Sequence, residues 1–195
     1  MMSNIWFTSD THFGHANIIK YCNRPFKNCY EHDEALIANW NHVVGPQDHI
    51  YHLGDFGFGS KGYMIQILNR LHGLIFFVKG NHDKAVKKDE VSAYFQWMKD
   101  YYELPIQDKE MNHKHKIVLC HYAFEVWNKK HFGAWHLHGH SHGSLQSPDY
   151  MARLDVGVDV HGYTPVSYQK VKEIMTRKVF KPIDKHGQGE GYRKK

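Results

Sequence analysis

Short apolar runs recur along the chain, and each one ends in a polar cluster. The runs are rich in β-branched and aromatic residues, which is typical of buried β-strands. Because open α/β sheets bind their ligands at the carboxyl ends of their strands, we expect the polar clusters to meet at one edge. The predicted strands cover residues 5–8, 49–53, 74–78, 116–119, 134–137 and 154–160.

Between these runs, apolar residues recur at the spacing of amphipathic helices. Leu36, Ile37 and Trp40 form one such stripe, and Met64 and Leu68 belong to a second. The alternation of strands and helices predicts an α/β fold. We expect helices over 31–44 and 61–72, over part of 91–99, and from about 165 to 175.

The last part of the chain differs in composition from the rest. Residues 181–195 are rich in Gly and Lys and lack hydrophobic periodicity, so we expect a flexible basic C-terminal tail there. Residues 1–180 contain no internal repeat and no low-complexity linker, and they are predicted to form a single domain.

Composition narrows the class of protein. The chain of 195 residues is 42% hydrophobic and 23% charged, as in ordinary soluble proteins. Its net charge of +5 favours anionic ligands but does not establish nucleic-acid binding. Three cysteines without a CxxC pair predict free thiols. No apolar stretch reaches the length of a membrane span and no signal-peptide pattern is seen, so we expect a cytoplasmic protein.

The chain contains 18 histidines, and several of them lie in the polar clusters at the predicted strand ends. Carboxylates, one amide oxygen and several imidazoles together suit transition-metal ions such as Mn, Fe, Ni or Zn. A single cluster is weak evidence, because an Asp in a turn or a His on the surface is common; five in order are a strong signal. The clusters are Asp10-Thr11-His12, Gly54-Asp55, Gly80-Asn81-His82-Asp83, Cys120-His121 and Gly139-His140-Ser141-His142.

These motifs resemble those of the calcineurin-like metallophosphoesterase superfamily, over residues 5 to about 161. The small size and the doubled Gly-His-x-His look like its bacterial and phage phosphodiesterase-type members. The resemblance implies a four-layer α/β/β/α sandwich with two central mixed sheets and a site for two divalent metal ions. It implies Asp10, His12, Asp55 and His142 as ligands of one ion, and Asp55, Asn81, His121 and His140 as ligands of the other, with Asp55 bridging.

A pair of such ions can share a hydroxide that attacks phosphorus and can stabilise the charge that develops. The resemblance implies that His82 acts on the leaving group, and we expect Asp83 to orient His82 and raise its pKa. Substrate binding is predicted for His15, Arg24 and Arg153, because an arginine suits a phosphate bidentately.

The substrate class stays open between two kinds of phosphoester. A nucleotide-like phosphodiester is preferred, a small phosphomonoester is the alternative, and nucleic acid is a further class that the charge allows. Residues 54–59 lack the Asp-Arg-Gly continuation of protein Ser/Thr phosphatases, which argues against a phosphoprotein. A non-catalytic metal-binding scaffold is disfavoured because every ligand position and His82 are present. The sequence specifies neither the metal nor the oligomeric state.

The other histidines receive simpler interpretations. His52, His136 and His138 lie inside apolar runs and are expected to support the ligands or pack in the core. Asp155 and Asp159 are expected to be structural. Surface positions are expected for His32, His42, His49, His72, His113, His115, His131 and His186.

Overall fold

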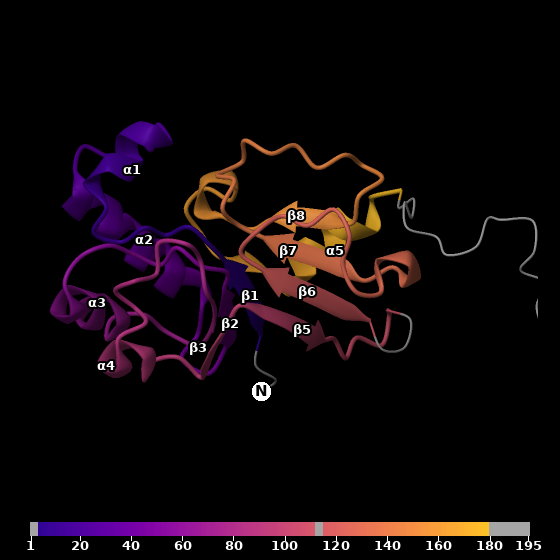
Figure 1. Cartoon of the computed structure of the whole chain (residues 1–195), viewed down its shortest axis with the longest axis horizontal. Helices are drawn as coiled ribbons and strands as arrows, with labels where there is room; N and C mark the ends of the chain where they lie inside the picture. Colours follow the sequence, from indigo (N-terminus) through magenta and orange to yellow (C-terminus); the bar gives the residue numbers. More distant parts are fainter. Residues whose placement is uncertain (1–3, 112–114, 180–195) are drawn as a thin grey trace, which may run out of the picture.

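The computed structural model describes residues 4–111 and 115–179, and it contains two β-sheets that pack against each other (Figure 1). The first sheet has the strand order β4-β3-β2-β1-β9, and the second has the order β5-β6-β7-β8. The predicted tail at 181–195, His113 and His186 lie outside the described residues.

The first sheet is mostly parallel. It contains β1 (Ile5–Thr8), β2 (His49–His52), β3 (Leu74–Val78) and β4 (Trp97–Lys99) in parallel, and β9 (Val166–Ser167) runs antiparallel beside β1. In the register, Thr8 lies opposite His52, which lies opposite Phe77. The carboxyl ends of β1, β2 and β3 therefore meet at one edge, as predicted.

The second sheet is also mixed. It contains β5 (Tyr101–Pro105), β6 (Lys116–Cys120), β7 (Trp135–His138) and β8 (Arg153–Asp155). Only the β5–β6 pair is antiparallel among these described strands, and Leu119 lies opposite Leu137 in the parallel β6–β7 pair. The prediction of an α/β fold with two central mixed sheets is confirmed.

Two hydrophobic cores hold these layers together. Phe7, Leu119 and Leu137 are fully buried in the core to which both sheets contribute. Trp40 and Phe77 belong to a second core, which packs the first sheet against its helices. The helices are α1 (Ala16–Tyr21), α2 (Cys29–Val43), α3 (Lys61–Leu68), α4 (Asp89–Ser92) and α5 (Tyr168–Thr176), of which α5 contacts β1, β8 and β9.

The other face of the second sheet is covered by the segment that follows β6. Phe124 stacks on the buried ring of His136, with the ring centroids 5.1 Å apart, and Trp127 lies beside the same ring. This segment ends in the 3₁₀ turn η1 (Lys130–Phe132) just before β7. Of the two roles expected for His136, support of the ligands or packing, these contacts favour packing against the segment that covers the sheet.

The helix expected over part of 91–99 is the short α4, which reaches Ser92, and Trp97–Lys99 is a strand because it pairs with β3. Two local predictions were wrong. The predicted strand at 154–160 ends at Asp155, whose carboxylate accepts the Gly157 N–H at 2.8 Å; a second 3₁₀ turn, η2 (Val158–Val160), follows. His32 is buried and not on the surface, because its ring bonds to Arg24 and Asp33.

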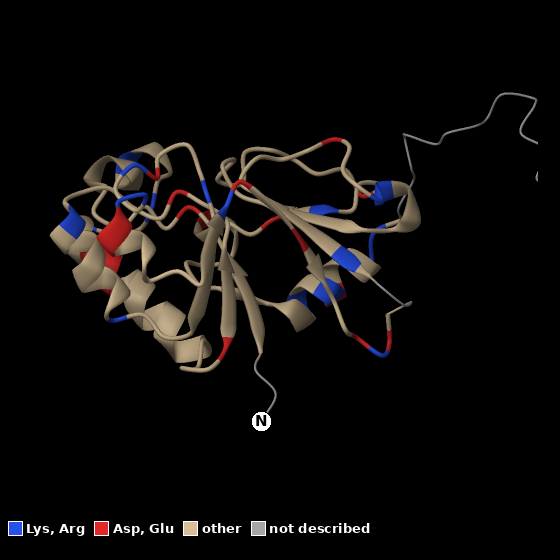
Figure 2. Cartoon of the chain, turned by 60° about the horizontal axis from the view of Figure 1, so that its bottom comes forward, with Lys and Arg blue, Asp and Glu red and all other residues tan. Residues whose placement is uncertain are grey.

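None of the helices within 4–111 and 115–179 is long and apolar enough to span a bilayer. Positively and negatively charged positions are intermixed along the chain in Figure 2.

Candidate metal centre

The ends of five strands bring the predicted ligands together. Asp10 and His12 follow β1, and Asp55 follows β2. Two backbone hydrogen bonds join these segments, from the Asp10 N–H to the Gly54 carbonyl and from the His12 N–H to the Asp55 carbonyl, each at 3.0 Å. Asn81 follows β3, His121 follows β6, and His140 and His142 follow β7. The centre therefore draws on both sheets.

A first cluster contains Asp10, His12 and His142, whose potential ligand atoms all lie within 4.8 Å of one another. The Asp10 carboxylate is fully buried and accepts the His140 N–H at 3.0–3.1 Å. Burial raises the pKa of Asp10 to about 7, against the opposing effect of His121 and His142. A buried carboxylate of this kind favours a nearby cation.

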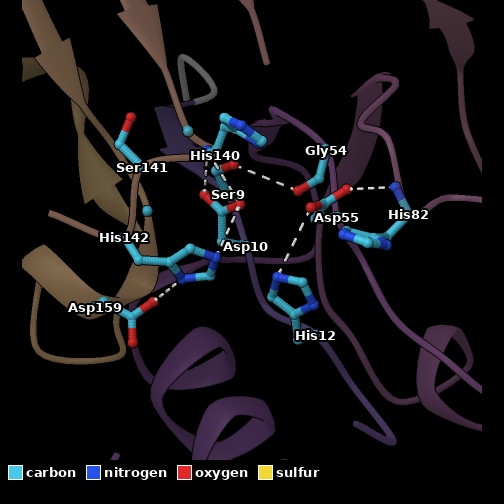
Figure 3. Close-up of polar contacts among 12 residues, drawn as sticks. Ser9, Asp10, His12, Gly54, Asp55, His82, His140, Ser141, His142 and Asp159 are labelled. Carbon is cyan, nitrogen blue, oxygen red and sulfur yellow. Dashed lines mark hydrogen bonds and ion pairs between the residues drawn. The ribbon is translucent and has the colours of Figure 1, made fainter. Parts of the chain in front are cut away.

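A second cluster contains Asp55, His121 and His140, again within 4.8 Å. Asn81 adds its amide oxygen, which lies 3.0 Å from His121 Nε2. Asp55 Oδ2 lies 3.5 Å from His121 Nε2 and 3.8 Å from His12 Nε2, so its carboxylate stands between the two clusters (Figure 3). Burial raises the pKa of Asp55, but the hydrogen bond and charge of His121 outweigh it, and the net shift is downward.

The donor set suits divalent metal ions. Both ring nitrogens of His12 are buried without a hydrogen-bond partner among the described residues, although buried polar atoms normally have one. Burial lowers the pKa of His12 to about 2, which keeps the imidazole neutral, the form that binds metals. The imidazoles, carboxylates and amide oxygen suit Mn, Fe, Ni or Zn, and the arrangement follows the predicted division into two ligand sets.

The backbone is unusual at the same positions. Asp10, His12, Asp55, His140 and His142 all have positive φ, between 47° and 68°. A left-handed conformation is uncommon for residues other than Gly and costs roughly 1 kcal/mol or more at each one. Such strain tends to gather at functional sites, and here it turns the chain so that side chains from consecutive turns face one centre.

Glycines permit the close approach of the segments. A Cβ atom at Gly80 would lie 2.3 Å from Asp55 Oδ1, and one at Gly139 would lie 1.9 Å from Ser9 Oγ. Both contacts are far inside van der Waals distance. The glycines in Gly-Asn-His-Asp and Gly-His-x-His are therefore required for packing at the centre.

Carboxylate and carbonyl groups orient two of the ligand rings. His142 Nδ1 lies 2.7 Å from Asp159 Oδ2, which leaves Nε2 facing Asp10 at 4.0 Å (Figure 3). His121 Nδ1 lies 2.8 Å from the Leu53 carbonyl oxygen. Such partners set the tautomer and direction of a ligating imidazole. Asp159 was predicted to be structural, and no sequence spacing linked it to His142.

His82 and His15 lie at one side of the centre, around the ring of Phe58. The Phe58 centroid is 4.1 Å from that of His15, 5.2 Å from that of His82 and 5.7 Å from that of His12. The main-chain N–H of His82 donates to Asp55 Oδ1 at 2.9 Å, and His82 is exposed. His82 is therefore placed beside both clusters and remains accessible to a substrate.

Asp83 does not have the geometry that we expected. Its carboxylate accepts the N–H groups of Gly80 at 2.6 Å, Asp55 at 2.9 Å and Phe56 at 2.9 Å, and it is fully buried. Within the described residues no hydrogen bond joins it to the His82 ring. Asp83 thus ties the loop after β2 to the loop after β3, and orienting His82 is not supported.

Arg24 is buried and its donors are already used. All five of its N–H groups have acceptors, supplied by both oxygens of Asp159, the carbonyls of Asp10 and Thr11, and His32 Nε2. Arg24 therefore supports the centre through Asp159. It has no free N–H donor for the contact with substrate that the sequence predicts.

Arg153 lies on β8, where its guanidinium donates to the Phe124 carbonyl and the Ser147 hydroxyl. Within the described residues, no side-chain hydrogen bond joins Arg153 to a member of the two clusters. Of the three predicted substrate-binding residues, the structure brings only His15 to the accessible side of the centre.

Comparisons with known proteins agree with this geometry. Residues 3–165 match the family described as calcineurin-like phosphoesterase. The chain is 35% identical to the uncharacterized protein MJ1445 of Methanocaldococcus jannaschii, over 94% of this chain and 98% of that protein. It is 29% identical to the gene 66 protein of Mycobacterium phage L5, over 83% of this chain and 89% of that protein.

A solved structure gives the same result. The crystal structure of AQ665 from Aquifex aeolicus, a protein of unknown function, superposes with a TM-score of 0.67 at 26% identity, over 89% of this chain and all of that one. Family match, fold and ligand clusters agree with one another, and the chain belongs to the calcineurin-like phosphoesterase family.

Proposed function

We propose that this chain is a metal-dependent phosphodiesterase that hydrolyses small, nucleotide-like phosphodiesters. The observation that carries the proposal is the pair of three-donor clusters, with the Asp55 carboxylate between them and His82 beside them. Family membership supports phosphoester hydrolysis in general, and the choice of a diester is our own step.

In this proposal Asp10, His12 and His142 hold one divalent ion; Asn81, His121 and His140 hold the other; and Asp55 serves both. When bound, such a pair supplies Lewis acidity toward phosphoryl oxygens and a nucleophile derived from water at neutral pH. The protein contributes the fixed separation of the two clusters and the orientation of each imidazole.

In this proposal His82 protonates the leaving oxygen. Its main-chain N–H is bonded to Asp55, and its exposed imidazole, with its centroid 6.1 Å from that of His12, can donate a proton to an alkoxide as the P–O bond breaks. A nucleoside alkoxide is a poor leaving group and needs such a donor.

Charge at the centre favours a diester over a monoester. A phosphomonoester carries about two negative charges near neutral pH, whereas a diester carries one. Arg24, the arginine nearest the clusters within the described residues, has all its donors engaged by protein acceptors. Arg24 therefore cannot form a bidentate hydrogen-bonded pair with the dianionic phosphate of a monoester.

The test is hydrolysis of bis-p-nitrophenyl phosphate and p-nitrophenyl phosphate after reconstitution with Mn²⁺, Fe²⁺, Ni²⁺ or Zn²⁺. We expect the diester to be the better substrate, and we expect Asp55→Ala to lose bound metal and nearly all activity. His42→Ala, on the exposed side of α2, is the matched control and should retain both. A metal-loaded protein that prefers the monoester would favour the phosphomonoesterase alternative, and one inactive on both esters would refute phosphoesterase function.

The role of His82 is tested with a leaving-group series. His82→Ala should slow hydrolysis of a dinucleotide by roughly 10²–10⁴-fold, the usual contribution of a general acid. It should slow p-nitrophenyl esters much less, because p-nitrophenolate leaves without a proton. Equal effects on both substrates would rule out proton donation by His82.

A further inference from the structure

A cavity of about 320 Å³ opens beside His82, on the side of Phe58. It is lined by Gly57, Phe58, Gly59, His82, Lys84, Ala85 and Lys88. Ligand pockets in proteins begin at roughly 300 Å³. The cavity therefore has room for part of a substrate that extends from the metal centre past His82.

Its position relates it to the leaving group. His82 belongs to both the cavity and the centre, and the Phe58 ring contacts the rings of His82 and His12. If His82 donates a proton to the leaving oxygen, the group attached to that oxygen extends into this cavity. This step rests on the proposed function.

Two lysines give the cavity its charge. Lys84 and Lys88 are exposed, and within the described residues no acidic side chain forms an ion pair with either. Lys79 and Lys61, by contrast, pair with Asp100 and Glu90. An ammonium group on a flexible stem binds phosphate as a point charge. Two unneutralised lysines beside an aromatic ring match the phosphate and the apolar face of a nucleotide.

We propose that this cavity is a subsite for a second phosphate, carried by the leaving nucleoside of the substrate. The preferred substrate is then a phosphodiester such as a 5′-phosphorylated dinucleotide. In its hydrolysis water adds to the bridging phosphorus, the P–O3′ bond breaks, and the nucleoside 5′-phosphate leaves as the alcohol. The subsite recognises the terminal phosphate and takes no part in the bond changes.

The size of the site favours a short substrate over a long nucleic acid. The cavity is a single local pocket, and cationic and acidic positions are intermixed over the described chain in Figure 2. Long strands are bound by a continuous cationic track that follows the backbone.

The test compares pTpT with TpT, which differ only in the 5′-phosphate on the leaving nucleoside. We expect the metal-loaded wild type to prefer pTpT by about tenfold in kcat/KM, mostly through KM. The Lys84→Ala/Lys88→Ala variant should reduce this ratio to about one to two. Lys87→Ala is the matched control, because Lys87 lies on the same loop but does not line the cavity, and it should keep the ratio. A wild type without the preference, or a double variant that keeps it, overturns the subsite.

A binding measurement separates failure of the subsite from failure of the proposed function. Calorimetry with thymidine 5′-phosphate in EDTA should give a Kd about tenfold weaker for the double variant than for wild type and Lys87→Ala. Equal Kd values overturn the subsite whether or not the protein hydrolyses diesters. Selective binding without any diester hydrolysis under every metal tested keeps the anion site but overturns its assignment to a leaving nucleoside.

Discussion

Asp83 can either hold the loops after β2 and β3 together or orient the His82 ring. The first role predicts a loss of stability when Asp83 is replaced, and the second predicts a change in the pH–rate profile. Its buried carboxylate accepts three backbone N–H groups, from Gly80, Asp55 and Phe56, at 2.6–2.9 Å. An unsatisfied buried donor costs about 1–3 kcal/mol, so the loss of an acceptor for three donors in Asp83→Ala should lower the free energy of unfolding by about 3–9 kcal/mol. Asp83→Asn keeps one acceptor oxygen but turns an NH₂ group toward the remaining donors, and it should cost about 2 kcal/mol.

The assay is urea unfolding followed by Trp fluorescence, with and without Mn²⁺. The midpoint should fall in the order wild type, Asp83→Asn, Asp83→Ala, at an unchanged m value. Asp100→Asn is the control, because the Asp100 side chain is 83% exposed and its ion pair with Lys79 should be worth less than about 1 kcal/mol. Metal affinity should fall with stability, since Asp83 aligns the loops that carry Asp55 and Asn81.

An Asp83→Asn protein that unfolds within about 0.5 kcal/mol of wild type, inside the range of ordinary surface changes, would show that the Asp83 carboxylate does not hold the two loops together. If that protein instead showed a shifted pH–rate profile, Asp83 would act on the His82 ring, as its neighbouring position in the sequence first indicated.

Three further substitutions test contacts at the metal centre, in the core and on the outer face of the second sheet. Asp159→Asn should weaken metal binding at the first cluster by roughly 10–100-fold, because His142 loses the carboxylate at Nδ1. A Mn²⁺ titration in which the variant and the wild type bind metal with equal affinity would contradict this prediction. Leu137→Ala, in the core to which both sheets contribute, should cost about 2–5 kcal/mol in urea unfolding, and a loss below about 1 kcal/mol would argue against the packing described. Burial lowers the pKa of His136 to about 3. Below a pH of about 6.5 the unfolded chain therefore binds a proton at this residue and the folded chain does not. The free energy of unfolding falls as the pH falls. His136→Gln should remove about 1.4 kcal/mol per pH unit of that slope between pH 6 and 4, as measured by urea unfolding, and an equal slope in both proteins would disprove it.

Most of the sheet framework could be predicted because its central strands are buried and rich in apolar residues. β1, β2, β3, β6 and β7 all follow from this pattern. β4 and β5 do not, because their residues are largely half-exposed or exposed and their strand state comes from pairing with β3 and β6. The burial of His32 likewise depends on Arg24, a partner that no local pattern reveals.

The ligand clusters could be predicted because each motif follows a strand, and parallel strands bring their ends together. The residues that support the ligands could not. Asp159 and Arg24 are 135 positions apart in the sequence, yet they form a bidentate pair behind His142. Asp83 shows the opposite case, because proximity in sequence to His82 indicated a contact that the backbone directs elsewhere.

The division of ligands between the sheets has a mechanical consequence. Each cluster mixes donors from the first sheet, such as Asp10 and Asp55, with donors from the second, such as His142 and His121. Bound cations would link the two sheets by ligation, in addition to the apolar contacts between the sheets. Removal of the metal by a chelator should therefore lower the melting temperature of the whole domain. Separation of the two sheets would release the metal and abolish turnover at the same time.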